Sequence, residues 1–134
     1  MVLARTLLLA ALAVLPGNDP VELGFGILAG FDYEEGMELP EEVTKYDGKR
    51  VKVNGFMRRE DGDDGPTEYF MLISDACGCD GMPMLNEVIF CEIADAVEIA
   101  ANTVTVTGTL YVGEEIDDGI VVSIYTLDAE SVER

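Results

Sequence analysis

Five short stretches of this sequence have the pattern of β-strands, and their order along the chain constrains the fold more than any other feature. In residues 50–57, apolar Val51 and Val53 alternate with polar neighbours, which predicts a half-buried strand. In residues 103–112, valines alternate with threonines, a strongly β-prone combination. The predicted strands are residues 50–57, 68–74, 87–92, 103–112 and 120–127.

One predicted helix interrupts this series of strands. Residues 94–101 are rich in alanine, and Ala94, Val97 and Ala101 follow the three-and-four spacing of a short helix. Three strands, a short helix and a two-stranded hairpin are the order of the OB-fold, a five-stranded, partly open Greek-key barrel. We therefore expect a mainly β, OB-like barrel over residues 47–134. A five-stranded meander that sandwiches the helix is the alternative.

The first twenty residues differ from the rest of the chain. Arg5 is the only charge before an apolar run at residues 6–15. As a helix this run would span about 15 Å, half of the roughly 30 Å needed to cross a bilayer, so we expect no stable membrane span. We predict a signal peptide at residues 1–17, a periplasmic or secreted protein, and a loose leader at residues 18–46 that packs on the barrel. A buried N-terminal helix is the alternative.

Acidic side chains greatly outnumber basic ones. The chain has 27 Asp and Glu against 8 Lys and Arg, a net charge of −19, and no histidine. This charge repels phosphate backbones and argues against a nucleic-acid partner. Without imidazole, the serine and cysteine triads are excluded, and we expect no enzymatic activity. The carboxylates are spread along the chain, which favours a surface hydrated at high salt over a cation-binding face.

Three cysteines carry the soft chemistry of the sequence. Cys77 and Cys79 share an irregular segment with Met82 and Met84, and Cys91 lies in the third predicted strand. In an exported protein the default is one disulfide to Cys91, with the remaining thiol unpaired. Alternatively, the three thiolates, with a thioether sulfur of Met82 or Met84, form a soft site suited to Cu(I) or Zn. Reduced cysteines without a role are the third possibility.

Residues 47–57 read DGKRVKVNGFM, which resembles the DGKxVxxxGFM opening of an uncharacterised bacterial family of exported proteins, a domain of unknown function. Cys77, Pro83 and Asn86 fall where that family has a cysteine-bearing loop, a proline-containing stretch and an asparagine. Many relatives carry Cys-x-His where this chain has a second cysteine, Cys79. Family members are often encoded beside export-type transporter components, so the resemblance implies an accessory periplasmic role with such a component as partner.

Two functions follow as hypotheses. The leading one is a non-enzymatic exported binding module that presents the cysteine segment to a protein or a small ligand. The alternative is a soft-metal carrier or sensor that binds Cu(I) or Zn through Cys77, Cys79 and Cys91.

Overall fold

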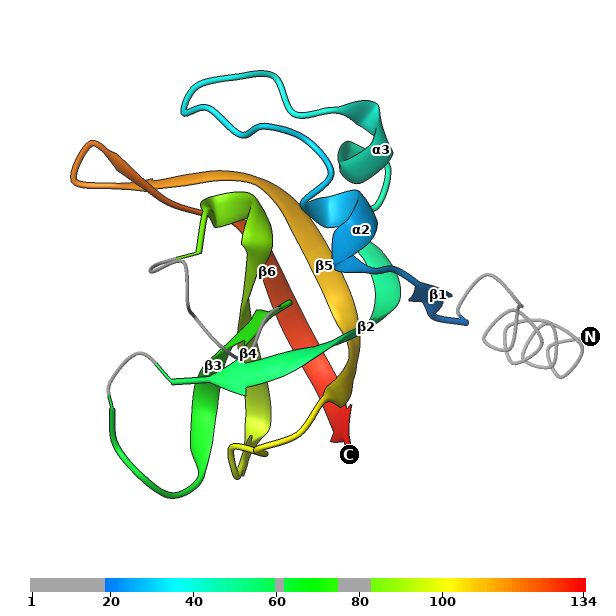
Figure 1. Ribbon diagram of the computed structural model, residues 1–134, viewed down its shortest axis with the longest axis vertical. Coiled ribbons are helices and arrows are strands. Elements are labelled where there is room, and N and C mark those ends of the chain that lie inside the picture. Colours follow the sequence, from blue (N-terminus) through cyan, green and yellow to red (C-terminus); the bar gives the residue numbers. More distant parts are fainter. Residues whose placement is uncertain (1–18, 60–61, 75–82) are drawn as a thin grey trace, which may run out of the picture.

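The chain folds into a single sheet that curves into a partly open barrel (Figure 1). The computed structural model describes residues 19–59, 62–74 and 83–134. The predicted signal peptide at residues 1–17 lies outside the described residues. Helical turns are α2 (Phe25–Leu28), α3 (Glu41–Thr44) and the 3₁₀ turn η2 (Leu85–Glu87). The strands are β1 (Val21–Glu22), β2 (Lys49–Arg58), β3 (Thr67–Ile73), β4 (Val88–Val97), β5 (Val104–Asp117) and β6 (Ile120–Glu133).

The strand order confirms the predicted OB-like barrel. Neighbouring strands follow the order β2, β3, β4, β6, β5, and β5 returns to pair with β2. β4 and β6 run parallel, whereas β4 in a meander would pair with β5, so the meander is wrong. Among the described residues, β2 pairs with β3 only over Phe56–Arg58 and Met71–Ile73. This short pairing leaves the barrel partly open.

The helix predicted at residues 94–101 is wrong. β4 continues through Val97, and Val97 pairs with Thr67 of β3. Residues 98–103 connect β4 to β5 without a helix. An isolated helix of about eight residues is marginal in water, whereas extension of β4 satisfies backbone hydrogen bonds along an existing partner strand. Strand pairing therefore overrides the alanine-rich local pattern.

Alternation along the strands separates the barrel interior from its outer face. On β4, Ile89, Cys91 and Ile93 are buried, while Phe90 is half-buried and Glu92 is exposed. This is the period-two pattern of a strand with one face in the core. The fully buried side chains from the barrel strands include Val51, Val53, Leu72, Ile89, Val104, Val106, Leu110, Ile124, Tyr125 and Leu127.

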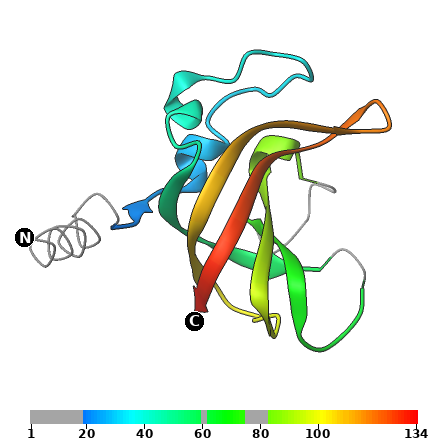
Figure 2. The same cartoon turned by 180° about the vertical axis from the view of Figure 1, so that it is seen from behind.

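Segments before β2 complete this core. Leu23, Phe25 and Leu28, around α2, and Val43 of α3 join the same buried cluster as the barrel side chains. The phenol of Tyr125 in β6 donates a 2.6 Å hydrogen bond to the carbonyl oxygen of Leu28. Figures 1 and 2 show α2 and α3 together beside the barrel, near the start of β2. The N-terminal segment is thus part of the packed structure.

No helix in the described ranges has the length and apolar character needed to cross a membrane.

We predict that Tyr125→Phe destabilises the fold by about 1–2 kcal/mol, because it leaves the buried Leu28 carbonyl without its donor and barely changes the packing. Urea unfolding followed by circular dichroism measures this change. Tyr111→Phe is the matched control, since Tyr111 is 49% exposed. Equal stability of the two variants would show that the Tyr125 hydroxyl does not hold α2 in place.

Candidate functional site

The cysteine segment singled out by the sequence is only partly described. Cys77, Cys79 and Met82 lie outside the described residues. Met84 precedes η2 and is 54% exposed, whereas Cys91 is 3% exposed and belongs to the core cluster. The predicted disulfide and the predicted metal site therefore stay predictions.

Cys91 occupies an environment that disfavours its thiolate. Burial raises the pKa of the Cys91 thiol well above its ordinary value, and the thiol donates a weak hydrogen bond to the carbonyl oxygen of Ile89, 3.7 Å away. The thiolate is the form that attacks electrophiles and binds metals. Among the described residues, no group of three or more His, Cys, Asp or Glu side chains could hold a metal ion. In this part of the chain, Cys91 behaves as a core residue.

A groove on the outer face of the sheet is the strongest candidate site. It has a volume of about 460 Å³ and crosses β3, β4, β6 and β5, which are neighbours in the sheet (Figure 2). We call it the tyrosine groove. It is lined by Tyr69, Phe90, Glu92, Tyr111, Glu115, Thr126 and Asp128, together with Cys91 and Leu127.

Strand register arranges these side chains in two rows. In one row, Phe90 of β4 pairs with Thr126 of β6, and Thr126 pairs with Tyr111 of β5. In the next, Tyr69 of β3 pairs with Glu92 of β4, and Glu92 pairs with Asp128 of β6. Each row brings together residues far apart in the sequence, because facing side chains on neighbouring strands lie about 5 Å apart.

Aromatic rings in the tyrosine groove are unusually accessible. Tyr69 is 65% exposed and Tyr111 is 49% exposed, and Phe90 is half-buried between them along the sheet. Large aromatic side chains are usually buried, or lie exposed where they contact a partner. Tyr69 and Tyr111 therefore mark a surface suited to binding.

The groove is also acidic. Glu92, Glu115 and Asp128 line it, and no lysine or arginine among the described residues does so. The salt bridge of Arg50 with Glu130, at 2.8 Å, lies outside the groove. The groove thus presents rings and carboxylates without a basic residue in its lining.

Sequence reasoning missed this site. Tyr69 and Tyr111 fall within the strands predicted at residues 68–74 and 103–112, and no motif distinguishes them there. A local signal was present, because Tyr69 precedes buried Phe70 and Tyr111 follows buried Leu110. Alternation therefore points both tyrosines outward. The pairing that puts them on one face is not visible in the sequence.

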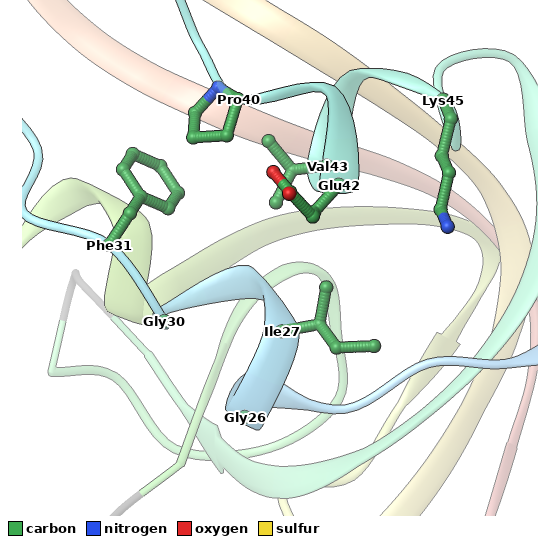
Figure 3. Close-up of a pocket in the computed structure, with 8 residues that line it drawn as sticks. All are labelled: Gly26, Ile27, Gly30, Phe31, Pro40, Glu42, Val43 and Lys45. Carbon is green, nitrogen blue, oxygen red and sulfur yellow. The ribbon is translucent and has the colours of Figure 1, made fainter.

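A second hollow, of about 410 Å³, lies between α2 and α3 (Figure 3). Figure 3 shows Ile27 on α2 below Val43 and Glu42 of α3, with Phe31 and Lys45 on opposite sides. Its one basic side chain, Lys45, places its ammonium 5.3 Å from the ring centre of Tyr46. All of its lining residues lie before β2, so this hollow is formed within the N-terminal segment itself.

The loop after α2 is fastened by Glu114 of β5. The Glu114 carboxylate accepts hydrogen bonds from the Tyr33 hydroxyl at 2.6 Å and the Gly36 backbone N–H at 2.7 Å. These two bonds lower the pKa of Glu114, while burial and the hydrogen bond to Glu114 raise the pKa of Tyr33 to about 12. The ionised carboxylate is therefore the form that holds the loop.

Known structures share this fold. A crystal structure of a DUF3299 family protein from Pseudomonas aeruginosa is similar to this chain, with a TM-score of 0.61 and 18% sequence identity. The similarity covers 86% of this chain and 95% of that protein. No family model matches the sequence, and no curated protein matches it significantly. The similarity shows a common fold with a protein from a family of unknown function.

We predict that acid releases the loop held by Glu114. Because its folded-state pKa is lowered, the attachment is complete above the ordinary carboxyl pKa of 4.5 and is lost as the pH falls through the lower, folded value. The NMR shift of the Gly36 amide, followed between pH 7 and pH 2, reports this change. In Glu114→Gln the same shift should stay nearly constant with pH; a wild-type transition retained in that variant would assign it to another group.

We predict that native Cys91 resists thiol reagents. In Cys77→Ser/Cys79→Ser, where Cys91 is the single thiol, modification at pH 8 should be slower by about 100-fold than that of free cysteine, because the thiol is protonated and inaccessible. Unfolding in guanidinium should restore the normal rate. Fast modification of the folded variant would contradict the buried position.

Proposed function

We propose that this chain is a non-enzymatic exported binding module and that the tyrosine groove is its ligand-binding surface. The observation that carries the proposal is the exposure of Tyr69 and Tyr111 across a groove of about 460 Å³. A groove of this volume has room for a small ligand or for a few residues of a peptide.

The position of the groove in the barrel supports this role by analogy of fold. OB-folds commonly bind ligands on the outer face of their second and third strands and at the loop that joins the fourth to the fifth. Here the second and third barrel strands are β3 and β4, which carry Tyr69 and Glu92. Glu115 lies near the end of β5, on the arm of the hairpin that leads to β6.

The proposal of a non-enzymatic role rests on the chemistry of the available side chains. The sequence has no histidine to act as a base. Ser123 is buried, and its hydroxyl makes no hydrogen bond among the described residues, so it lacks the neighbour that activates a serine nucleophile. The groove offers aromatic rings, carboxylates and the hydroxyl groups of Tyr69, Tyr111 and Thr126, which are groups that hold a ligand.

Export and an accessory role are supported by the sequence. The apolar run at residues 6–15, preceded by Arg5, has the pattern of a signal peptide. The resemblance to exported proteins encoded beside transporter components suggests that the module serves a membrane complex. Cys77 and Cys79 follow β3 in the sequence, so the cysteine segment adjoins a strand of the groove along the chain and forms part of the proposed binding module.

Soft-metal binding through Cys77, Cys79 and Cys91 stays a prediction with less support. The burial that raises the pKa of Cys91 makes its thiolate costly to form, and a thiolate is what Cu(I) or Zn requires. Binding at the tyrosine groove needs no ionisation change.

We predict that occupation of the tyrosine groove is visible by NMR. The chain, labelled with ¹⁵N, is titrated separately with basic, acidic and neutral eight-residue peptides and with a neutral hexasaccharide. At least one probe should shift the amides of Tyr69, Phe90, Tyr111 and Thr126, and Tyr69→Ser/Tyr111→Ser should weaken that binding by about tenfold or more.

Val21→Ser/Ile27→Ser is the matched control. These apolar side chains are 44% and 42% exposed, lie in β1 and α2, and do not line the groove. Their replacement should leave binding unchanged. Equal losses in both double variants, or shifts confined to other surfaces, would contradict the assignment of the groove as the binding surface.

A further inference from the structure

We propose that the tyrosine groove binds an extended, lysine- or arginine-rich segment of a partner protein. This inference rests on the proposed binding function and specifies the chemistry of the ligand. It comes from three features of the groove: unpaired carboxylates, exposed rings, and dimensions that match an extended peptide.

Two of the carboxylates are neighbours across strands. Glu92 of β4 and Asp128 of β6 are register partners on the outer face, and both are exposed. Neither makes an ion pair or a side-chain hydrogen bond among the described residues. Like charges that face each other across neighbouring strands are unfavourable. A cationic group placed between Glu92 and Asp128 would remove this repulsion. Relief of the repulsion would therefore favour binding of a cation at this position.

The arrangement does not suit a single metal ion. Glu92, Glu115 and Asp128 line one groove, yet no three carboxylates among the described residues converge closely enough to hold a metal. Separated carboxylates complement separated positive charges. A chain of basic side chains has that distribution, whereas one metal ion does not.

The tyrosine rings complement the same ligand. A cation over an aromatic face is attracted by the negative face of the ring, also at an exposed site. This chain already makes one such contact, with the Lys45 ammonium 5.3 Å from the ring centre of Tyr46. Tyr69 and Tyr111 have exposed rings that can receive ammonium or guanidinium groups in the same way.

The groove has the length of a short peptide. From β3 to β5 it spans three strand spacings, or about 14 Å, which matches about four extended residues at roughly 3.3 Å each. Because Tyr69 and Tyr111 remain 65% and 49% exposed, the groove is too open to bury most of a small molecule, as drug-sized ligand sites do. A segment of a partner protein fits these dimensions.

The overall charge aids the encounter. At −19, the chain attracts basic segments from a distance and speeds their association, more strongly at low salt. Charge alone would attract them to every acidic surface. The groove must therefore be distinguished from the rest of the acidic surface by variants of equal charge.

The test uses an eight-residue peptide that alternates lysine with serine, with fluorescence anisotropy measured at about 150 mM salt. Counterparts with glutamine or glutamate in place of lysine report the requirement for positive charge. The lysine peptide should bind with at least tenfold higher affinity than the glutamine peptide and should shift the amides of Tyr69, Phe90 and Thr126.

Charge-matched variants separate the groove from general electrostatics. Glu92→Gln/Asp128→Asn should weaken binding by at least about tenfold, as expected for two lost ion contacts. Asp32→Asn/Glu38→Gln removes the same charge at exposed positions outside the groove and should change affinity less than about twofold. Tyr69→Ala/Tyr111→Ala keeps the charge and should weaken binding by about tenfold, with thermal unfolding used to confirm that each variant folds.

The possible outcomes are distinct. Equal weakening by both acid-removing variants overturns the proposal, because attraction is then general. Binding of the glutamine peptide or the hexasaccharide at the groove, with none for the lysine peptide, overturns the basic-segment inference and leaves the binding module intact. If none of these probes shifts the amides of the groove, both the basic-segment inference and the proposed binding function are rejected.

Discussion

The pairing of β5 with β2 is the interaction on which the rest of the structure depends. Seven register pairs, from Lys49 with Leu110 to Gly55 with Val104, close the sheet into a ring. Gly108 lies within this closure, paired with Val51 on one side and Ala129 on the other. A Cβ at Gly108 would collide with the backbone of Asp128 and Ala129. Glycine at this position lets the backbones of β5 and β6 approach closely.

Closure gives each strand one inner and one outer face, and this separates buried side chains from those that a ligand can reach. Cys91 points into the core, where burial suppresses its ionisation, while its neighbours Phe90 and Glu92 face outward. Cys91, which the sequence marked as a candidate disulfide and metal-binding residue, is therefore less accessible than either neighbour on β4. The side chains of β4 that a ligand can reach are those at the alternate positions, Phe90 and Glu92.

Much of the barrel could be predicted from the sequence because its signals are local. Val51 and Val53 show the inward face of β2, and alternating threonine and valine mark β5. The prediction of a helix at residues 94–101 was wrong because the pairing of Val97 with Thr67 is a tertiary interaction, which local residue spacing does not reveal. The tyrosine groove could not be assembled for the same reason. Its residues come from four strands, and only the register brings them together.

The parallel pairing of β4 with β6 also changes the meaning of the acidic composition. Spread along the sequence, the carboxylates suggested a hydrated surface. The fold places Glu92 beside Asp128, which are 36 positions apart in the sequence. In a meander β4 would pair with β5, and these two residues would not be partners. A one-residue slip of β6 would turn Asp128 inward. Strand register thus places two acidic side chains that are distant in the sequence next to each other on the surface of the groove.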